Sequence, residues 1–370
     1  MKSRRVQALL ENALRARIGS GIAASWGKID GIRSGVSPNE IHLGRHSHEP
    51  GSGLVHRNSF FDLASLTKIL LTTLLAMERV ERGALRLDSR LADLLPDYVR
   101  KNPAAGAVTV HHLLTHTSGL PAWRPLYERL REKFGDDLDR VPVPTRRAFF
   151  DSLVDEVPLE CATGERVIYS DLGFLLLERV LTRDLPGDAK RLYGRVPGLQ
   201  LGDPGAGDMQ VGSLHRGGPA ERQAVATELC PWRGLLRGRV HDDNAWSRGV
   251  LSGHAGLFGR LQDLQLWVEA LFSEKWVSMR TLRQFTRTVA DSRGSVRAPG
   301  FDVPARDGSG STGASFSMSS IGHLGFTGTS LWLDLDSGDY AILLTNRVHP
   351  SRADDRIRKL RREYHEEVRR

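Results

Sequence analysis

Segments with the character of β-strands lie near both ends of the chain, and this distribution is the feature that most limits how the chain can fold. Runs of apolar and alternating residues, bounded by glycine, proline and small polar residues, mark five candidate strands: Gly21–Trp26, Glu40–Arg45, Ala314–Ser320, Ser330–Asp336 and Tyr340–Thr345. The residues Asp336-Ser337-Gly338-Asp339 supply a hairpin turn between the last two. The region between the two groups has a mostly helical pattern, including a long helix from about Ser65 to Arg82. We therefore expect one sheet, assembled from the two ends of the chain.

Each end of the chain also carries an amphipathic helix. The apolar stripes of these two helices are formed by Val6, Leu9, Leu10, Ala13 and Leu14 and by Ile357, Leu360, Tyr364 and Val368. We expect both helices to cover one face of an antiparallel sheet, with the helical middle of the chain on the other side. This is an α/β fold of the α+β type, in which residues 1–61 and 312–370 form a sheet lobe and residues 62–311 form a mainly helical lobe. Two Gly-rich segments, residues 198–220 and 291–313, are expected to be loops.

Composition and charge exclude several classes of function. Hydrophobic residues make up 40% of the 370 residues, yet the longest apolar stretch, Ile69–Met77, is only nine residues and too short to span a bilayer. The net charge is +8, but residues 1–17 contribute +4 and residues 352–370 contribute +3, so the basic side chains do not indicate a nucleic-acid groove.

The cysteines and histidines favour a cytoplasmic protein without a metal site. Two cysteines, Cys161 and Cys230, are typical of free thiols in a reducing compartment, and the amphipathic N-terminus does not resemble a signal peptide. The cysteines do not have the spacing of a zinc site, and His46 and His48 lack an acidic or histidine partner.

The residues that carry chemistry are Ser65 and Lys68, at the start of the long helix. Positions i and i+3 share one face of a helix, so the Lys68 amine can reach the Ser65 hydroxyl and take its proton. An isolated Ser-x-x-Lys is more often a capping serine with a surface lysine, and a second copy, Ser25 to Lys28, lies at a strand end and is attributed to chance. The Gly-x-Ser-x-Gly motif of α/β-hydrolases is absent from the sequence.

Five segments, in order along the chain, resemble signatures of the serine β-lactamase-related hydrolases. This group contains class C β-lactamases, D-alanyl-D-alanine carboxypeptidases, D-aminopeptidases and family VIII esterases. The similar segments are Phe60–Lys68, Leu113–Leu120, Tyr169–Phe174, Gly253–Phe258 and Gly322–Thr329. The resemblance covers about residues 5–365 and implies a β-lactamase/transpeptidase-like fold, with the active site between the two lobes.

The resemblance also implies roles for individual residues. Ser65 would be the nucleophile, Lys68 the base or proton relay, and Tyr169 the partner base and the acid toward the leaving group. The oxyanion hole would be formed by the backbone N–H groups of Ser65 and Phe326. The implied substrate-binding residues are Asp171, His323, Gly325 and Trp123. His254, between two glycines, is either structural or part of the site wall, and no metal or organic cofactor is implied.

Two positions depart from the β-lactamase pattern. Asp171 stands where asparagine is usual, and an ionised carboxylate cannot donate a hydrogen bond to a substrate carbonyl. It should also keep Lys68 protonated, which favours Tyr169 as the base. His323 stands where lysine is usual and carries less charge at pH 7. Both changes favour ester or peptide hydrolysis over β-lactam hydrolysis.

We therefore expect a serine hydrolase that forms an acyl-enzyme on Ser65 and acts on a small ester, a D-amino-acid amide or peptide, or a peptidoglycan-derived fragment. The alternatives are a β-lactamase or D,D-carboxypeptidase proper and, from another class, a catalytically inactive ligand-binding relative. We expect a monomer or weak homo-oligomer without nucleic-acid or membrane partners.

Overall fold

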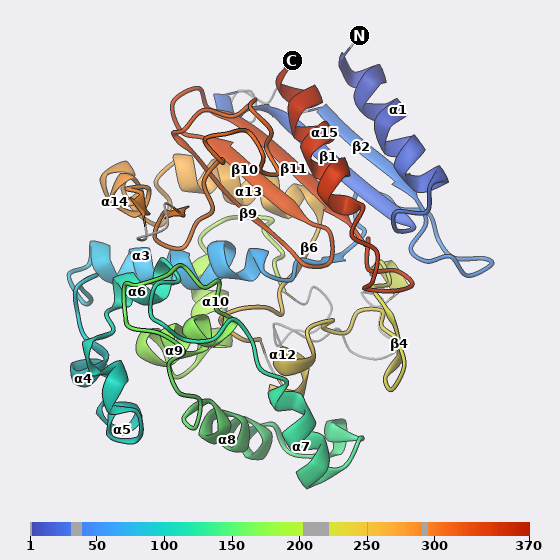
Figure 1. The fold of residues 1–370 in the computed structure, drawn as a ribbon. Helices are drawn as coiled ribbons and strands as arrows, with labels where there is room; N and C mark the ends of the chain where they lie inside the picture. Colours follow the sequence, from blue (N-terminus) through green and yellow to red (C-terminus); the bar gives the residue numbers. More distant parts are fainter. Residues whose placement is uncertain (1, 31–38, 203–221, 250, 291–294) are drawn as a thin grey trace.

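The computed structural model describes residues 2–30, 39–202, 222–249, 251–290 and 295–370 (Figure 1). Its centre is a five-stranded sheet in the order β2-β1-β11-β10-β9. The strands are β2 (Asn39–Gly44), β1 (Gly21–Lys28), β11 (Asp339–Thr345), β10 (Ser330–Asp334) and β9 (Ser320–Leu324). All four pairings are antiparallel, and β1 lies beside β11 with Ile22 opposite Thr345. The expected antiparallel sheet built from both ends of the chain is confirmed.

The two terminal helices, α1 (Lys2–Arg15) and α15 (Ile357–Arg369), lie against each other on one face of this sheet (Figure 1). Their apolar stripes join the outward-facing residues of the strands in one buried cluster, which includes Val6, Leu10, Trp26 and Tyr364. The Tyr364 hydroxyl donates to the carbonyl of Ile342 at 2.9 Å, so the last helix is also tied to the central strand.

The opposite face of the sheet packs on the helical part of the chain. Helix α13 (Leu261–Phe272) contacts β1 and β11 directly, and the apolar core continues from these strands into the helices beyond. Those helices are α3 (Leu74–Glu81), α4 (Leu91–Leu94), α5 (Pro96–Lys101), α6 (Val110–Leu114), α7 (Leu126–Phe134), α8 (Val143–Val154), α9 (Asp171–Leu181), α10 (Leu185–Tyr193), α12 (Asp243–Arg248) and α14 (Met279–Phe285). Three pairs of two-residue strands complete this part: β3 (Phe61–Asp62) with β6 (Phe258–Gly259), β4 (Leu229–Cys230) with β5 (Gly234–Leu235), and β7 (Val289–Ala290) with β8 (Val296–Arg297).

The strand predicted at Ala314–Ser320 is wrong, because the edge strand β9 begins only at Ser320. In the predicted segment the serines hydrogen-bond to nearby backbone: the Ser315 hydroxyl donates to the Thr312 carbonyl at 2.7 Å, and the Ser320 N–H donates to the Ser317 carbonyl at 3.0 Å. Such local bonds favour turns over a ladder. Most of the loop predicted at residues 198–220 lies outside the described residues, as do residues 291–294 of the second loop.

The described part of the chain bears on two expectations, about membrane-spanning segments and about the cysteines. None of its helices combines the length and apolar character needed to cross a membrane. Cys161 and Cys230 are both free thiols.

Candidate active site

The turn between β3 and the following helix presents Ser65. Ala64 has a left-handed backbone conformation (φ 46°), which is strained for a residue with a side chain and is typical of functional turns. The Asp62 carboxylate holds the turn, because it accepts the Ala64 N–H at 2.8 Å and the His241 N–H at 2.7 Å. Asp62 therefore caps this turn. No described group accepts the N–H of Ser65, so it is free to bind a ligand.

Lys68 is fully buried at the start of a π-helical segment, η1 (Lys68–Thr73), and all three of its ammonium protons have acceptors. It donates to the Ser65 hydroxyl at 3.0 Å, to the Asp171 carboxylate at 2.7 Å and to the His254 carbonyl at 3.0 Å. Burial lowers the pKa of Lys68, but the negative charge of Asp171 and the Tyr169 hydroxyl outweigh this effect and raise it above its usual value. Lys68 is thus an ammonium ion at neutral pH, as expected from Asp171.

Tyr169 lies beside this cluster. Its ring centroid is 4.9 Å from the Lys68 ammonium, 4.6 Å from the His116 ring centroid and 5.8 Å from the His323 ring centroid. Desolvation raises the pKa of Tyr169, and the charge of Lys68 opposes the rise without cancelling it. The phenol therefore keeps its proton at neutral pH and can donate it.

The turn between β9 and β10 carries the second expected oxyanion donor, and no described group accepts the Phe326 N–H. Two threonines fasten this turn to the nucleophile segment: the Thr327 hydroxyl donates to the Asp62 carbonyl at 2.7 Å and the Thr329 hydroxyl to the Leu63 carbonyl at 3.2 Å. Gly325 is required by this close approach, since a Cβ there would lie 2.0 Å from the Thr329 hydroxyl oxygen. The turn's backbone thus has a fixed position relative to Ser65.

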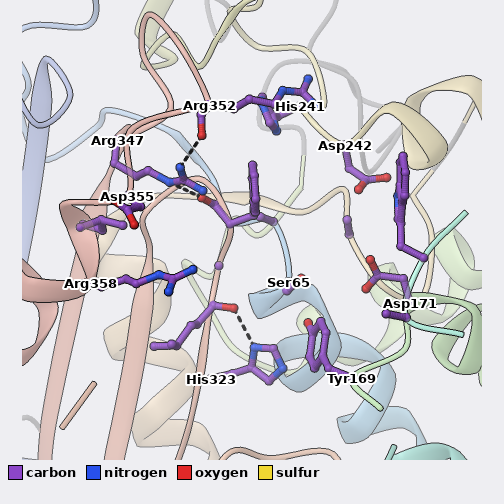
Figure 2. A pocket seen from close by; sticks show the side chains of 18 of the residues that line it. Ser65, Tyr169, Asp171, His241, Asp242, His323, Arg347, Arg352, Asp355 and Arg358 are labelled. Atoms are coloured by element: carbon purple, nitrogen blue, oxygen red, sulfur yellow. Dashed lines mark hydrogen bonds between the residues drawn. The ribbon is translucent and has the colours of Figure 1, made fainter. Parts of the chain in front are cut away.

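A hollow of about 790 Å³ opens over Ser65 (Figure 2). The site residues expected from the sequence all line it, except Lys68, which is buried behind Ser65: Ser65, Trp123, Tyr169, Asp171, His323, Gly325 and Phe326. Trp123 and Phe326 are 41% and 51% exposed and offer apolar surface at this hollow.

His323 is a neutral hydrogen-bond acceptor in this wall. Burial and the charge of Lys68 hold the pKa of His323 well below its usual value. Its Nδ1 lies 2.9 Å from the Leu324 carbonyl, which can only accept, so Nδ1 carries the proton. Its buried Nε2 has no hydrogen-bond partner among the described residues. His323 therefore cannot replace the charge of a lysine, and it offers an acceptor to whatever occupies the hollow.

The sequence reasoning missed the arginines that line the hollow beside α15. Arg347 donates to the Phe326 carbonyl at 2.8 Å, and Arg352 pairs with Glu228 and Asp243. In contrast, the exposed Arg358 makes no ion pair or side-chain hydrogen bond with any described residue and extends into the hollow (Figure 2). Nothing in the sequence distinguished Arg358 from the other charged residues on the solvent-exposed face of a terminal helix.

The sequence reasoning also missed Asp242. Its contact with His254 shows why a histidine stands in this turn. The His254 ring lies 3.0 Å from the Asp242 carboxylate, while its carbonyl holds Lys68. Desolvation acts to raise the pKa of Asp242, but the histidine and the N–H of Ala245 lower it strongly overall. The tight turn at His254 is therefore part of the site. In the described part of the chain, no group of three or more His, Cys, Asp or Glu side chains is placed to hold a metal ion.

Comparisons with known proteins agree with this geometry. The model of the β-lactamase family matches residues 39–366. An N-acetylmuramyl-L-alanine amidase from Bacillus subtilis is 26% identical over 351 residues, covering 86% of this chain and 76% of the relative. A putative D-alanyl-D-alanine carboxypeptidase from Salmonella agona is 24% identical over 330 residues, covering 82% and 73%.

Solved structures share the fold at low sequence identity. A mutant of simvastatin synthase from Aspergillus terreus has a TM-score of 0.71 at 17% identity, covering 99% of this chain and 96% of the other. EstCE1, described as a hydrolase with promiscuous acyltransferase activity, has a TM-score of 0.70 at 19% identity, covering 99% and 98%. Together with the family match over most of its length, these findings establish that the chain belongs to the β-lactamase family and is a serine hydrolase.

Proposed function

We propose that this protein hydrolyses its substrate through an acyl-enzyme on Ser65. The observation that carries the proposal is the Lys68 ammonium at 3.0 Å from the Ser65 hydroxyl, in a site where the N–H groups of Ser65 and Phe326 are both free. Two such donors stabilise the oxyanion that forms when a serine attacks a carbonyl carbon. Their presence, with Lys68 and Tyr169 in place, argues against a catalytically inactive relative.

Lys68 serves as a proton relay in this proposal. Because it is already an ammonium ion, it accepts the Ser65 proton only as it passes one of its own protons to the Asp171 carboxylate, 2.7 Å away. Tyr169 gives its phenolic proton to the leaving group and regains one from Lys68. Asp171 then returns its proton to Lys68, so the net transfer is from the Ser65 hydroxyl to the leaving group and the ion pair is restored. Water then attacks the acyl-enzyme by the same route in reverse. The assignment of Tyr169 as the base is less favoured, since the phenol holds its proton.

The substrate class follows from the hydrogen bonds that the hollow supplies. Asp171 and the neutral His323 offer acceptors where β-lactam recognition needs a donor and a cation. We therefore propose a small ester or a D-amino-acid amide as substrate. A peptidoglycan-derived fragment also fits, because the relatives named above include an amidase of N-acetylmuramyl-L-alanine and a putative D-alanyl-D-alanine carboxypeptidase.

Arg358 favours a second candidate, a carboxypeptidase. Its guanidinium faces the hollow and could bind a substrate carboxylate, which His323 cannot do. Under this alternative, Arg358→Gln should lower kcat/KM for a D-alanyl-D-alanine peptide by about tenfold, the scale of one charged hydrogen bond, and leave a neutral ester unchanged. Equal effects on both substrates would remove this candidate.

A hydrolysis panel tests the proposed function. The panel contains p-nitrophenyl esters, D-alanyl anilides and the chromogenic cephalosporin nitrocefin. Ser65→Ala should abolish turnover of every substrate that the wild type hydrolyses. Ser25→Ala, in the other Ser-x-x-Lys segment, is the matched control and should remain active apart from any loss of stability, because the Ser25 hydroxyl hydrogen-bonds to Tyr340 on β11 and Gln265 on α13. Turnover that survives Ser65→Ala contradicts the proposal.

A further inference from the structure

A buried guanidinium on the last helix touches the turn that carries Phe326. Arg361 is 7% exposed, and its Nη2 donates to the carbonyls of Gly325 at 2.5 Å and Thr329 at 2.7 Å. No carboxylate among the described residues pairs with it, and its Nε lacks a partner. Burial and the nearby charge of Arg347 lower the pKa of Arg361 to about 9, so it remains charged at neutral pH. A buried charge with only neutral partners is costly, and ordinary packing does not explain it.

The geometry of one peptide unit connects this guanidinium to catalysis. The Gly325 carbonyl and the Phe326 N–H belong to the same planar peptide, and in a trans peptide they point in opposite directions. The carbonyl is held by Arg361 and by the N–H of Gly328 at 3.0 Å. The Phe326 N–H must therefore point away from Arg361, and its direction is fixed as long as the guanidinium grips the carbonyl.

The same turn is attached to the nucleophile segment on its other side. The hydroxyls of Thr327 and Thr329 bind the carbonyls of Asp62 and Leu63, which precede Ser65 in the chain. Arg361 thus completes a clamp that holds the Phe326 peptide between α15 and the Ser65 turn. A cation on the carbonyl oxygen also polarises the peptide and makes its N–H a stronger donor.

We propose that Arg361, which also lines the hollow, is a positioning residue of the oxyanion hole: it orients and polarises the Phe326 N–H through the Gly325 carbonyl. This inference rests on the proposed acyl-enzyme chemistry at Ser65. It assigns a function in catalysis to the C-terminal helix, which also contributes Ile357, Leu360, Tyr364 and Val368 to the apolar core.

The rival explanation is that Arg361 only holds α15 against the sheet. A purely structural role would reduce the amount of folded enzyme and affect all substrates alike. A role in the oxyanion hole would instead affect substrates in proportion to their use of the two N–H groups. An ester and its thionoester analogue separate these cases, because the thiocarbonyl sulfur is a much weaker hydrogen-bond acceptor than oxygen.

The test compares kcat/KM for a p-nitrophenyl ester and its thionoester in the wild type, Arg361→Met and Arg361→Lys. The ratio of the two values does not depend on the fraction of enzyme that is folded. In Arg361→Met we expect the ester to lose about 10- to 100-fold, up to the effect of removing one oxyanion donor, and the thionoester to lose less than about threefold. Arg361→Lys keeps the charge, and its kcat/KM for the ester should lie between those of the wild type and Arg361→Met. Arg362→Met is the control, since Arg362 is exposed and bonds only to Glu366.

The outcomes distinguish this proposal from the one on which it rests. A collapse of the ester-to-thionoester ratio in Arg361→Met, with partial rescue by lysine, supports the proposal. An unchanged ratio, with both substrates losing equally, overturns it and leaves Arg361 a structural residue, even if Ser65→Ala is inactive. Turnover that persists in Ser65→Ala overturns the proposed function itself. If Arg361→Met does not fold, the ratio in Arg361→Lys decides in the same way.

Discussion

Removing Asp171 alone from the Lys68–Asp171 ion pair should destabilise the protein more than removing both partners. The Lys68 side chain is fully buried, whereas that of Asp171 is 18% exposed. Breaking a buried pair by removing one partner costs about 3–5 kcal/mol, because the other charge is left uncompensated. Asp171→Asn leaves the buried ammonium with neutral acceptors, so we expect a loss of about 3 kcal/mol in the free energy of unfolding. Lys68→Met leaves a carboxylate that reaches solvent, and its cost should be smaller.

The double variant Lys68→Met/Asp171→Asn leaves no unpaired charge and should unfold at a higher temperature than Asp171→Asn alone. Activity should behave differently. Lys68→Met should lower kcat/KM for a p-nitrophenyl ester by about 10²–10⁴-fold, as lost proton transfer suggests. Asp171 acts through Lys68, so adding Asp171→Asn to Lys68→Met should cost no further activity.

Thermal unfolding and ester kinetics, measured on the wild type, the two single variants and the double variant, form a double-mutant cycle that tests these predictions. The reasoning is refuted if the double variant is the least stable of the three, because the pair would then not be held by mutual charge. It is also refuted if the two losses in log kcat/KM add, since Asp171 would then act independently of the lysine.

Three further predictions concern the site and the buried His365. Lys68→Ala and Tyr169→Phe should each lower kcat/KM by about 10²-fold or more, and the double variant should be much less than multiplicatively worse; additive losses in log kcat/KM would contradict a shared proton-transfer unit. The wild type should hydrolyse p-nitrophenyl acetate at least about 10²-fold better than nitrocefin, with Asp171→Asn/His323→Lys narrowing the gap, and equal rates would favour the β-lactamase alternative. Burial lowers the pKa of His365 to about 4 in the folded protein. As the pH falls below about 6.5, His365 therefore becomes protonated in the unfolded chain while it stays neutral in the folded one. This difference should lower the free energy of unfolding by about 2 kcal/mol at pH 5. Thermal unfolding at pH 7 and pH 5 should show this loss reduced in His365→Gln, and an equal loss in both proteins would contradict it.

Most of the fold and the centre of the site followed from local patterns. The apolar stripes of α1 and α15 and the short apolar runs of β1, β10 and β11 are properties of neighbouring residues, so the sequence alone could predict these elements. Ser65, in the turn before the helix, and Lys68, in its first turn, are three residues apart, and their 3.0 Å contact is likewise local. The error at Ala314–Ser320 arose because serine side chains compete for backbone groups in a way that alternation does not reveal.

The features that the sequence did not reveal depend on residues far apart in the chain. Asp242 lines the hollow and lies 3.0 Å from the ring of His254, and Arg361 hydrogen-bonds to Gly325, 36 residues away in the sequence. One signal for Arg361 was present, since it follows Ile357 by four residues and therefore lies on the apolar stripe of α15. An arginine within such a stripe indicates that its guanidinium has a buried hydrogen-bond acceptor, but the sequence does not identify that acceptor. The threonine hydroxyls that join the Phe326 turn to the Ser65 turn required the structure for the same reason.

Labelling with a fluorophosphonate probe, followed by peptide mapping with mass spectrometry, tests the assignment of Ser65 most directly. The probe reacts with activated serines and leaves a stable phosphonyl group on the nucleophile. We predict one modified residue, Ser65, in the wild type, no modification of Ser25, and no labelling of Ser65→Ala. A probe adduct on any other residue of the active wild type, or labelling that persists in Ser65→Ala, would contradict the assignment of Ser65 as the nucleophile.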